Sequence, residues 1–438
     1  MSSVLTKARR IHDRASYVAK ETGWSYFHAL GEIRRAKREK GIGSRDYVKK
    51  RLYDPKSQPK QLVIPEGISS EEAAYLKENL SPSWYRKALR DSKILLGIVD
   101  ADSYFPDRPR KPRNERMLDN MLWRKKHGFY NKLYNEFGLD VANFRNQDDY
   151  IERYEYVRYN SAPHHGNVIP ERYRMMAINK MWFYSYMQAI CPGLTPKMIY
   201  VFRDGDVILP YESGMSIEDA LCKLPEGTYA CKQLNGAFGK GFYRVDRGPG
   251  DEVLLNNGHD SIEDFINDMN HGSYILQDFV HQHPAISNLC PNSVNTVRIV
   301  TLRYHKKAHV FYALLRMASR ADSSVDNATQ GGTFVGIDEN TGKLMKYGHY
   351  FYRGEGETAH PVTGTVYEGY EIPYWDQIMK MVVELHEYFR GMVIIGWDIA
   401  LTENGPVILE INSKPCTRMA QLAHGGLQKK WDSLKNAQ

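Results

Sequence analysis

The sequence lacks several features that would assign it to a familiar class of protein. No apolar run is long enough to span a bilayer, and the first residues, MSSVLTKARRIHDR, lack the apolar core of a signal peptide. The 5 cysteines are an odd number with no CxxC spacing, which argues against a zinc site and for free thiols in a reducing compartment. There is also no internal repeat and no low-complexity tract. We therefore expect a globular, cytoplasmic protein.

Familiar nucleotide-binding and hydrolase motifs are missing as well. The glycine-rich stretch at 228–245, TYACKQLNGAFGKGFYRV, has neither the GxxxxGK[ST] spacing of a Walker A loop nor a helix after it. Its GxxGxG spacing joins two predicted strands, which excludes a dinucleotide fingerprint. No Ser-His-Asp or Cys-His arrangement is evident.

Positive charge is concentrated at the N-terminus. The 438 residues carry a formal net charge of +7, yet residues 1–60 hold 16 lysines and arginines against 6 acidic residues. We predict helices at 4–21 and 25–40 in this region, then a linker at 52–67 and a helix at 69–79. The basic face of 25–40 is either simply solvated or a surface for a phosphate-bearing partner, such as a lipid-linked intermediate, RNA or an anionic membrane.

Later segments have the patterns of alternating helices and strands, most regularly from residue 170. A basic loop is predicted at 107–116, and a polar tail at 424–438. The other predicted elements are helices at 117–137, 180–190 and 375–390, and strands at 198–202, 228–233, 242–246, 274–280, 296–304 and 309–316.

A predicted β-hairpin at 396–412, GWDIALTENGPVILEIN, contains the most informative pattern. Two β-branched runs flank an Asn-Gly turn signal. With the turn centred on Asn404, Asp398 lies opposite Glu410, and Asn412 shares the face of Glu410. Facing carboxylates repel each other, and a hard cation such as Mg²⁺ bound by oxygen ligands would remove that cost. The alternative is a hairpin whose polar face is solvated.

Other segments offer groups that suit phosphate. Glycines free a backbone to cradle phosphate, and a lysine in the first turn of a helix is well placed for an anion. The alternatives are that the lysine at the helix start is an ordinary surface residue and that the glycine-rich hairpin binds no ligand. The residues concerned are Lys180, Lys232, Gly236, Gly239, Lys240 and Gly241.

Two arginines stand inside apolar strands. Arg298 lies in VRIVTL and Arg316 in FYALLRMA, and a charge buried in a sheet needs a partner. A structural salt bridge and a bound phosphate are both open alternatives.

The order of these pieces resembles the ATP-grasp family, most closely its branch associated with sugar transfer. The segments that carry the resemblance are INKMWFYSYM, CKQLNGAFGKG, LQDFVHQHPAISNLCPNSVNTVRIVTL, TQGGTFVGID and GWDIALTENGPVILEINSKP. It covers about residues 95–425 and is strongest from 172 onward. Many relatives have a glutamate where this chain has Gln277.

The resemblance implies an α+β ATP-grasp fold, in which two subdomains grip the nucleotide. We expect a helical basic region at 1–94, a preceding region at 95–170, subdomains at 171–285 and 286–425, and a tail at 426–438.

The resemblance also implies roles for individual residues. Lys180 and Lys232 would contact phosphates under the glycine loop, and Arg298 and Arg316, with Lys232, would act in catalysis. ATP and one or two Mg²⁺ are the implied cofactors. The hinge that holds adenine would comprise Gln277, Asp278, Phe279 and Val280; the metal ligands would be Asp398, Glu410 and Asn412; substrate candidates are His283 and Arg418.

The implied reaction joins a carboxylate to an amine. ATP would phosphorylate the carboxylate, and an amine or another nucleophile would displace the phosphate, in glycan, nucleotide-sugar or natural-product biosynthesis. The acceptor would carry phosphate held by the basic N-terminal region, and a homo-oligomer is an open alternative. The rivals are a kinase on the same fold, which leaves phosphate on its product, and a non-catalytic nucleotide-binding adaptor.

Overall fold

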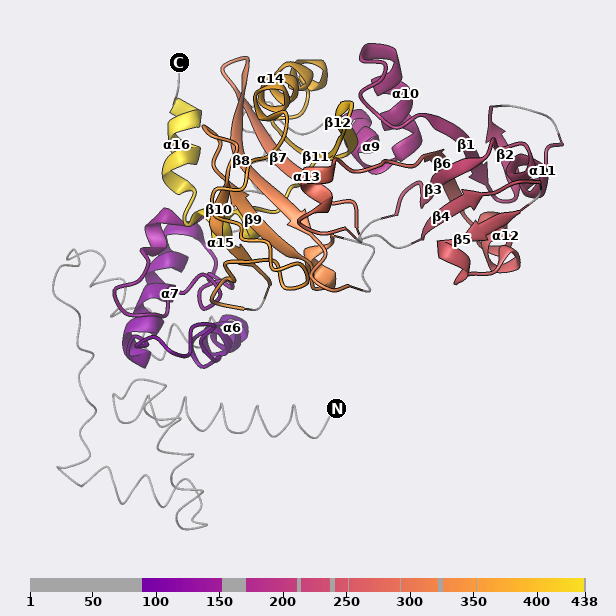
Figure 1. The fold of residues 1–438 in the computed structure, drawn as a ribbon. Helices are drawn as coiled ribbons and strands as arrows, with labels where there is room; N and C mark the ends of the chain where they lie inside the picture. Colours follow the sequence, from indigo (N-terminus) through magenta and orange to yellow (C-terminus); the bar gives the residue numbers. More distant parts are fainter. Residues whose placement is uncertain are drawn as a thin grey trace, which may run out of the picture. The chain divides into compact units, whose positions relative to one another are not determined.

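The computed structural model divides the chain into two compact units, Met1–Phe144 and Arg145–Gln438 (Figure 1). The elements predicted at 4–21, 25–40, 52–67 and 69–79 lie outside the described residues, and the predicted domain boundaries stay predictions. No helix in the described part is long and apolar enough to cross a membrane. The structure describes residues 89–151, 171–210, 214–236, 241–250, 252–291, 293–321, 326–351 and 353–436.

The described part of the first unit contains α6 (Leu89–Val99) and α7 (Arg113–His127). The helix predicted at 117–137 is wrong in its second half, because the chain leaves the helix at Gly128 with φ of 84°. Its N–H donates to the Arg124 carbonyl, and the basic last turn of α7 favours the helix dipole. Beyond it the chain is held by polar contacts, such as Arg110 Nε to Asp140 Oδ2 at 2.8 Å.

The first sheet of the second unit is antiparallel, with the order β2-β1-β6-β3-β4-β5. Helices α11 (Ile217–Cys222) and α12 (Ile262–Asn270) share an apolar core with one face of it. The strands are β1 (Met198–Arg203), β2 (Asp206–Leu209), β3 (Gly227–Gln233), β4 (Phe242–Arg247), β5 (Val253–Leu255) and β6 (Ser273–Asp278). A short helix, η4 (Asn256–Gly258), follows β5 directly.

The other face of the first sheet belongs to a second core, which includes Val201, Ile275 and the buried side of α10. Lys232 pairs with Ile275, and Ala230 pairs with Gln277, so Lys232 and Gln277 lie on this face. The helices that follow one another here are α9 (Glu171–Ile178) and α10 (Lys180–Ile190), and Asn179 caps α10 as predicted.

The second sheet is also antiparallel, with the order β10-β9-β8-β7-β11-β12. Its strands are β7 (Thr296–Tyr304), β8 (Lys307–Met317), β9 (Thr333–Ile337), β10 (Leu344–His349), β11 (Ile394–Thr402) and β12 (Gly405–Asn412). Short helices in its connections are α13 (Pro284–Ser287), η5 (Ala328–Gln330) and η6 (Glu387–Phe389).

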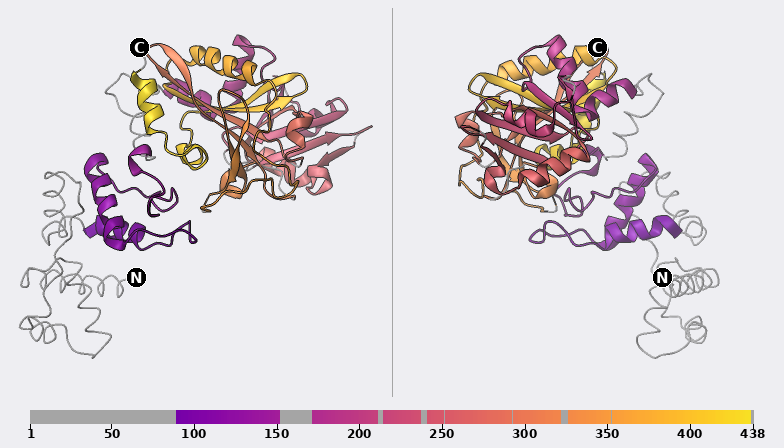
Figure 2. Two further views of the ribbon diagram at one scale, coloured as in Figure 1. Left: turned by 60° about the vertical axis from the view of Figure 1, so that its left-hand side comes forward. Right: turned by 90° about the vertical axis from the view of Figure 1, so that its right-hand side faces the viewer.

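One face of the second sheet packs against α14 (Trp375–His386), as Figures 1 and 2 show from different sides. Val297, Ile299 and Trp397 lie on this face in one core with Ile378 and Val382 of α14. Strand residues alternate between faces, so Arg298 and Asp398 lie on the opposite face. That face is partly covered by α15 (Thr417–His424), which contacts β8, β9 and β10.

The polar tail predicted at 424–438 is wrong, because this stretch contains α16 (Gln428–Asn436). Trp431 is buried, and its ring lies edge-on to Phe311 at 5.4 Å. Trp431 is the only buried residue within α16, whose sequence is otherwise mostly polar, so the pattern did not predict a packed helix. A further short helix, η2 (Gln147–Asp149), lies near α16. All five cysteines are described, and each is a free thiol.

Candidate active site

The predicted hairpin is confirmed, and Asp398 pairs directly with Glu410. The reason differs from the one expected. From Thr402 to Ile399 the pairing follows a two-residue turn, which would place Leu409 opposite Asp398. A β-bulge at that point shifts the register by one residue and brings Glu410 opposite Asp398 instead.

Neighbouring elements hold the bulge in place. The Tyr184 hydroxyl of α10 donates to the Leu409 carbonyl at 2.6 Å, and the Ile408 N–H donates to the Leu194 carbonyl at 2.8 Å. A bulge leaves backbone groups outside the ladder, and these bonds satisfy two of them. The helix that begins with Lys180 is thereby fixed to the strand that carries Glu410.

Gly396 sets the path of the chain after the hairpin. It pairs with Asn412, and a Cβ at Gly396 would lie 2.7 Å from the Cβ of Pro415. The segment after Asn412 therefore crosses closely over Gly396, and only a glycine leaves room for it. Packing against Pro415 thus explains why a glycine stands at position 396.

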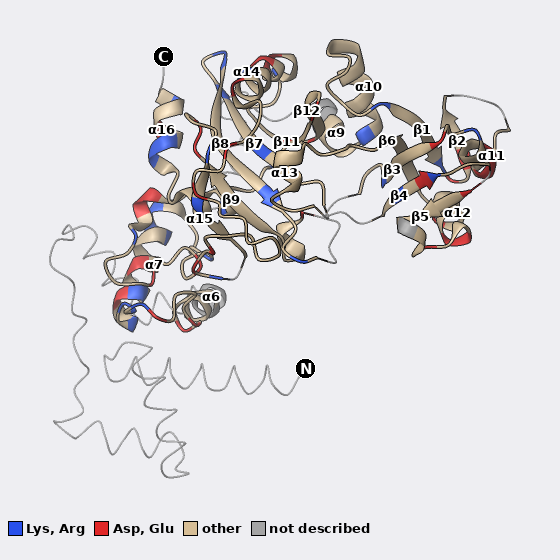
Figure 3. Ribbon diagram, in the orientation of Figure 1, with Lys and Arg blue, Asp and Glu red and all other residues tan. Residues whose placement is uncertain are grey.

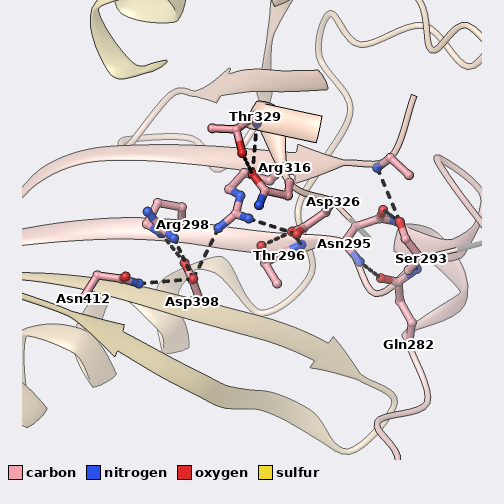
Figure 4. Close-up of polar contacts among 12 residues, drawn as sticks. Gln282, Ser293, Asn295, Thr296, Arg298, Arg316, Asp326, Thr329, Asp398 and Asn412 are labelled. Atoms are coloured by element: carbon pink, nitrogen blue, oxygen red, sulfur yellow. Dashed lines mark hydrogen bonds and ion pairs between the residues drawn. The ribbon is translucent and has the colours of Figure 1, made fainter. Parts of the chain in front are cut away.

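Asp398 is surrounded by donors from three strands (Figure 4). Arg298 lies directly opposite it on β7 and grips it with two nitrogens, one of them at 2.6 Å from Asp398 Oδ2. Arg316 Nη1 and Asn412 Nδ2 each lie 3.3 Å from the same oxygen. Both arginines therefore form ion pairs with an acid in this structure. We call Arg298, Arg316, Asp398, Glu410 and Asn412 the charged patch.

The two acids of the patch differ in pKa. Burial by itself raises the pKa of Asp398, but the charges of Arg298 and Arg316 outweigh it and lower that pKa to about 2. The pKa of Glu410 is raised, first by burial and then by the charge of Asp398 beside it. The pair therefore keeps Asp398 ionised and makes Glu410 the carboxyl that holds a proton more readily.

Asp326 is a member of this network that the sequence analysis missed. Its Oδ1 accepts from Arg316 Nη2 at 3.0 Å, and its Oδ2 accepts from the Thr296 N–H at 3.2 Å and from the Thr296 hydroxyl (Figure 4). It stands before TQGGTF, where Asn327 caps η5. An acid directly before a capping asparagine was the only available signal.

Lys180 and Lys232 both lie close enough to Glu410 for its charge to act on their pKa values. The Lys180 ammonium donates to the Gly236 carbonyl at 2.9 Å, and Asn179 caps α10 by accepting from the Trp182 N–H. Burial, followed by the charge of Lys180, lowers the pKa of Lys232 to about 8, although Glu410 acts in the opposite direction. Burial also lowers the pKa of Lys180, again opposed by Glu410. Two partly buried ammonium groups next to each other favour an anion between them.

The glycine loop is described at its two ends only. Gly236 and Gly241 border Gln233, whose N–H donates to the Gly241 carbonyl at 3.1 Å. Gly239 and Lys240 lie outside the described residues. The predicted strand–loop–strand arrangement is confirmed by the pairing of β3 with β4.

The predicted hinge follows the end of β6. Gln277 is buried beside the Tyr184 hydroxyl, and its side-chain amide makes no hydrogen bond of normal length and angle in the described part of the chain. The N–H groups of Asp278 and Phe279 donate to the carbonyls of Lys197 and Thr228. Arg244 lies over the Phe279 ring at 5.3 Å. The unsatisfied amide and the chain at Val280 are the parts of the hinge that a ligand could use.

The two substrate candidates have structural contacts of their own. His283 caps α13 by accepting from the Ala285 N–H at 3.1 Å, and its backbone N–H donates to the Leu401 carbonyl. It thus lies toward the turn of the hairpin and is not among the contacts of the charged patch. Arg418, in the first turn of α15, lies over the Phe351 ring at 4.0 Å.

Charge is sparse elsewhere on the strands of the second sheet. Figure 3 shows basic positions within β7 and β8, inside otherwise uncharged ribbons. No group of three His, Cys, Asp or Glu residues in the described ranges is placed to hold a metal ion. The candidate ligands at Asp398 are two carboxylates and one amide. The charged patch offers a pair of acids, two arginines and the amide of Asn412, and two lysines lie near Glu410.

Comparison with known proteins gives a family match that covers most of the second unit. Residues 170–436 match the family model described as sugar-transfer associated ATP-grasp. No curated protein matches the sequence.

Similar solved structures include three synthetases and ligases. The D-alanine–D-alanine ligase of Helicobacter pylori has 14% identity and a TM-score of 0.34, with 60% of this chain and 61% of that chain covered. For the L-amino acid ligase of Bacillus licheniformis the values are 12%, 0.32, 59% and 48%. For N5-carboxyaminoimidazole ribonucleotide synthetase of Thermotoga maritima they are 12%, 0.29, 55% and 42%. The family assignment depends on the sequence match.

Proposed function

The chain belongs to the sugar-transfer associated ATP-grasp family and has the α+β ATP-grasp fold, and we propose that it is an ATP-dependent ligase that joins a carboxylate to an amine through an acyl phosphate. The observation that carries the proposal is the charged patch. Five side chains from four neighbouring strands lie together on one face of the second sheet, and Lys180 and Lys232 lie near Glu410.

The donor set suits Mg²⁺. Asp398, Glu410 and Asn412 supply oxygen atoms from adjacent strand positions, and hard cations prefer oxygen ligands. Asn412 would turn its amide so that the oxygen, and not the nitrogen, faces Asp398. A bound Mg²⁺ would supply positive charge to the phosphate oxygens. The opposed pKa shifts of the two acids mark a place where a cation would relieve the repulsion between them.

Lysines and arginines would bind the phosphates from two sides. Lys180 and Lys232 have lowered pKa values because of burial, so an anion that restores their charge is bound favourably. The Arg316 Nε atom is buried and has no hydrogen-bond partner in the described part of the chain, which leaves a donor for a phosphoryl oxygen.

The unsatisfied Gln277 amide supports an adenine position at the hinge. A buried amide without partners costs free energy, and a base edge with one donor and one acceptor would satisfy both of its atoms. Val280 follows where the backbone has left β6, and its N–H would be the second contact.

The reaction proposed has two steps. A carboxylate oxygen of the substrate attacks the γ-phosphorus of ATP while the bond to the β–γ bridging oxygen breaks, which yields ADP and an acyl phosphate. The amine nitrogen then attacks the acyl carbon, phosphate leaves with the electrons of the C–O bond, and the amine proton passes to solvent. Arg298 and Arg316 would stabilise the charge on the transferred phosphoryl oxygens.

The substrates proposed are an amino acid or sugar acid as the carboxylate and an amine in a glycan, nucleotide-sugar or natural-product pathway. The family description supports a link with sugar transfer. The basic region of residues 1–60 would bind a phosphate-bearing acceptor, and removing residues 1–45 would weaken acceptor binding while ATP binding persists.

The test is a screen for ADP release with pairs of amino acids, sugar acids and amino sugars. A ligase releases free phosphate in step with ADP and only when both substrates are present. A kinase leaves the phosphate on its product, so ADP without free phosphate would replace the ligase proposal by the kinase. Glu410→Gln serves as the control for site-dependent turnover, and ADP release that this variant retains in full would refute the site.

A further inference from the structure

Arg316 is shared between two carboxylates. Its Nη2 lies 3.0 Å from Asp326 Oδ1 and its Nη1 lies 3.3 Å from Asp398 Oδ2. Both contacts involve largely buried side chains, with 13% of the Arg316 and Asp326 side chains and 4% of the Asp398 side chain exposed. Two fixed acceptors at the two ends of a planar guanidinium determine its orientation, and they leave the Nε edge for another acceptor.

Asp326 is itself anchored independently of Arg316. Its second oxygen accepts from the backbone N–H and the hydroxyl of Thr296, the residue opposite Arg316 on β7. The following Asn327 accepts from the Thr329 N–H at 2.9 Å, and its carbonyl accepts from the Gly332 N–H. A Cβ at Gly332 would lie 2.8 Å from the Asp326 carbonyl, so the loop closes tightly here.

Without Asp326, Arg316 would keep only Asp398 as a partner. It would then turn toward the oxygen that Arg298 and Asn412 already share. A second nitrogen of Arg316 would then add to the three donors that Asp398 already has, in competition with a cation, and the Nε edge would no longer keep its direction. Asp326 draws one nitrogen of Arg316 away from Asp398 and prevents this.

We propose that Asp326 is a positioning residue, which acts through Arg316 on the transferred phosphoryl group. What Arg316 does in the reaction rests on the proposed function. That Asp326 sets the direction of the Arg316 side chain rests on their contact alone. The two statements are therefore tested by different measurements.

The experiment is a double-mutant cycle of Asp326→Asn and Arg316→Gln in the full chain. The first readout is the affinity for MgADP with aluminium fluoride, a mimic of the phosphoryl group in transfer, compared with MgADP alone. We expect Asp326→Asn to weaken the affinity for the mimic about tenfold and to change the affinity for MgADP by less than about twofold, because only the mimic occupies the position that Arg316 faces. Coupled residues are non-additive, so the two substitutions should not add. In the Arg316→Gln background, the same substitution should change neither affinity. An equal loss in both backgrounds would overturn the proposal.

Thr296→Val is the matched control. It removes the hydroxyl that Asp326 accepts from and keeps both the N–H and the Arg316 contact. A loss of stability without a loss of mimic affinity is expected. If Thr296→Val weakened the mimic as much as Asp326→Asn does, Asp326 would act by holding the loop and not through Arg316.

Failure of the proposed function can be distinguished from failure of the positioning role of Asp326. If the wild-type chain does not bind MgADP, the function falls, and the cycle is then measured by urea unfolding. A midpoint shift in the double variant smaller than the sum of the single shifts supports the positioning contact, and additive shifts overturn it. The double variant replaces an ion pair by two amides, so it is expected to fold even if Asp326→Asn alone does not.

Discussion

Strands β7 and β11 present one face to α14, and their opposite face carries Arg298 and Asp398 of the charged patch. Toward α14 the residues are Val297, Ile299 and Trp397, all fully buried. The next residue along each strand points to the opposite face, and there Arg298 and Asp398 form an ion pair. All five side chains are buried, so what distinguishes the candidate site is the free-energy cost of burying charged groups there.

The comparison implies a division of roles. The apolar face contributes free energy of folding through burial, whereas the charged face gains little from its ion pair because desolvation offsets the attraction. Variants of the apolar face should therefore change stability and leave ligand binding intact, whereas a charged-face variant that leaves a buried charge unpaired should change both.

The largest expected effect is on the apolar face. Trp397→Ala should lower the free energy of unfolding by about 3–5 kcal/mol, because it leaves a cavity against Phe389 and removes the indole bond to Thr301. Urea unfolding measures it, and Val366→Ala at an exposed position is the control. The folded fraction should bind MgADP as the wild type does. Lost nucleotide affinity with an unchanged midpoint would contradict the division.

On the charged face, Asp398→Asn should be almost as costly, at about 3–5 kcal/mol, because it leaves Arg298 buried without a charged partner. This differs from the expectation for a plain metal ligand, whose neutral replacement would leave the fold intact. Circular dichroism during urea unfolding is the measurement. Unchanged stability of Asp398→Asn would show that the ion pair with Arg298 is not maintained in solution.

Glu410→Gln provides the contrast within the same pair of acids. Its stability should equal or exceed that of the wild type, because the substitution removes a carboxylate that Asp398 repels. Turnover should fall about a hundredfold or more, as for loss of one group that stabilises a transition state. ADP release with the substrate pair from the screen measures it. A stable variant with full activity would remove Glu410 from the site.

Much of this arrangement followed from local sequence pattern, and the rest required contacts between distant segments. Short-range features are the hairpin at 396–412, the Asn179 cap of α10 and the pairing of β3 with β4 on either side of the glycine loop. The bulge at Leu409 depends on Tyr184, which is remote in sequence. It gave the predicted pair by a different register, so a correct pairing did not establish a correct turn.

The ion pairs were beyond the reach of pattern for the same reason. Arg298 meets Asp398 because β11 lies next to β7, a neighbour relation between strands 100 residues apart. Asp326 reaches Arg316 through the fold of a loop. The sequence showed that each arginine needs a partner, but it left salt bridge and phosphate equally open.

A smaller effect is expected from pH, through Lys232. Its lowered pKa of about 8 means that the free protein loses the ammonium proton near that pH. Phosphate prefers the charged form, so binding takes up a proton, and metal-free ADP should bind about tenfold more weakly at pH 9 than at pH 7. Calorimetry in two buffers of different ionisation enthalpy measures the uptake. Lys232→Met should abolish this pH dependence, and an affinity that rises with pH would contradict the assignment.

The smallest expected effect concerns the cap that positions Lys180. Asn179 accepts from the Trp182 N–H at 3.2 Å and donates to Asn235 at the glycine loop, also at 3.2 Å. Asn179→Ala should cost about 1 kcal/mol of stability and Asn179→Ser only part of that, because serine retains the cap and loses the bond to Asn235. Because serine keeps the cap that orients Lys180, calorimetry should show that Asn179→Ser binds ADP as the wild type does and that Asn179→Ala binds it more weakly. Weaker binding by both variants would contradict this and would show that the loop side of the site depends on the contact with Asn235.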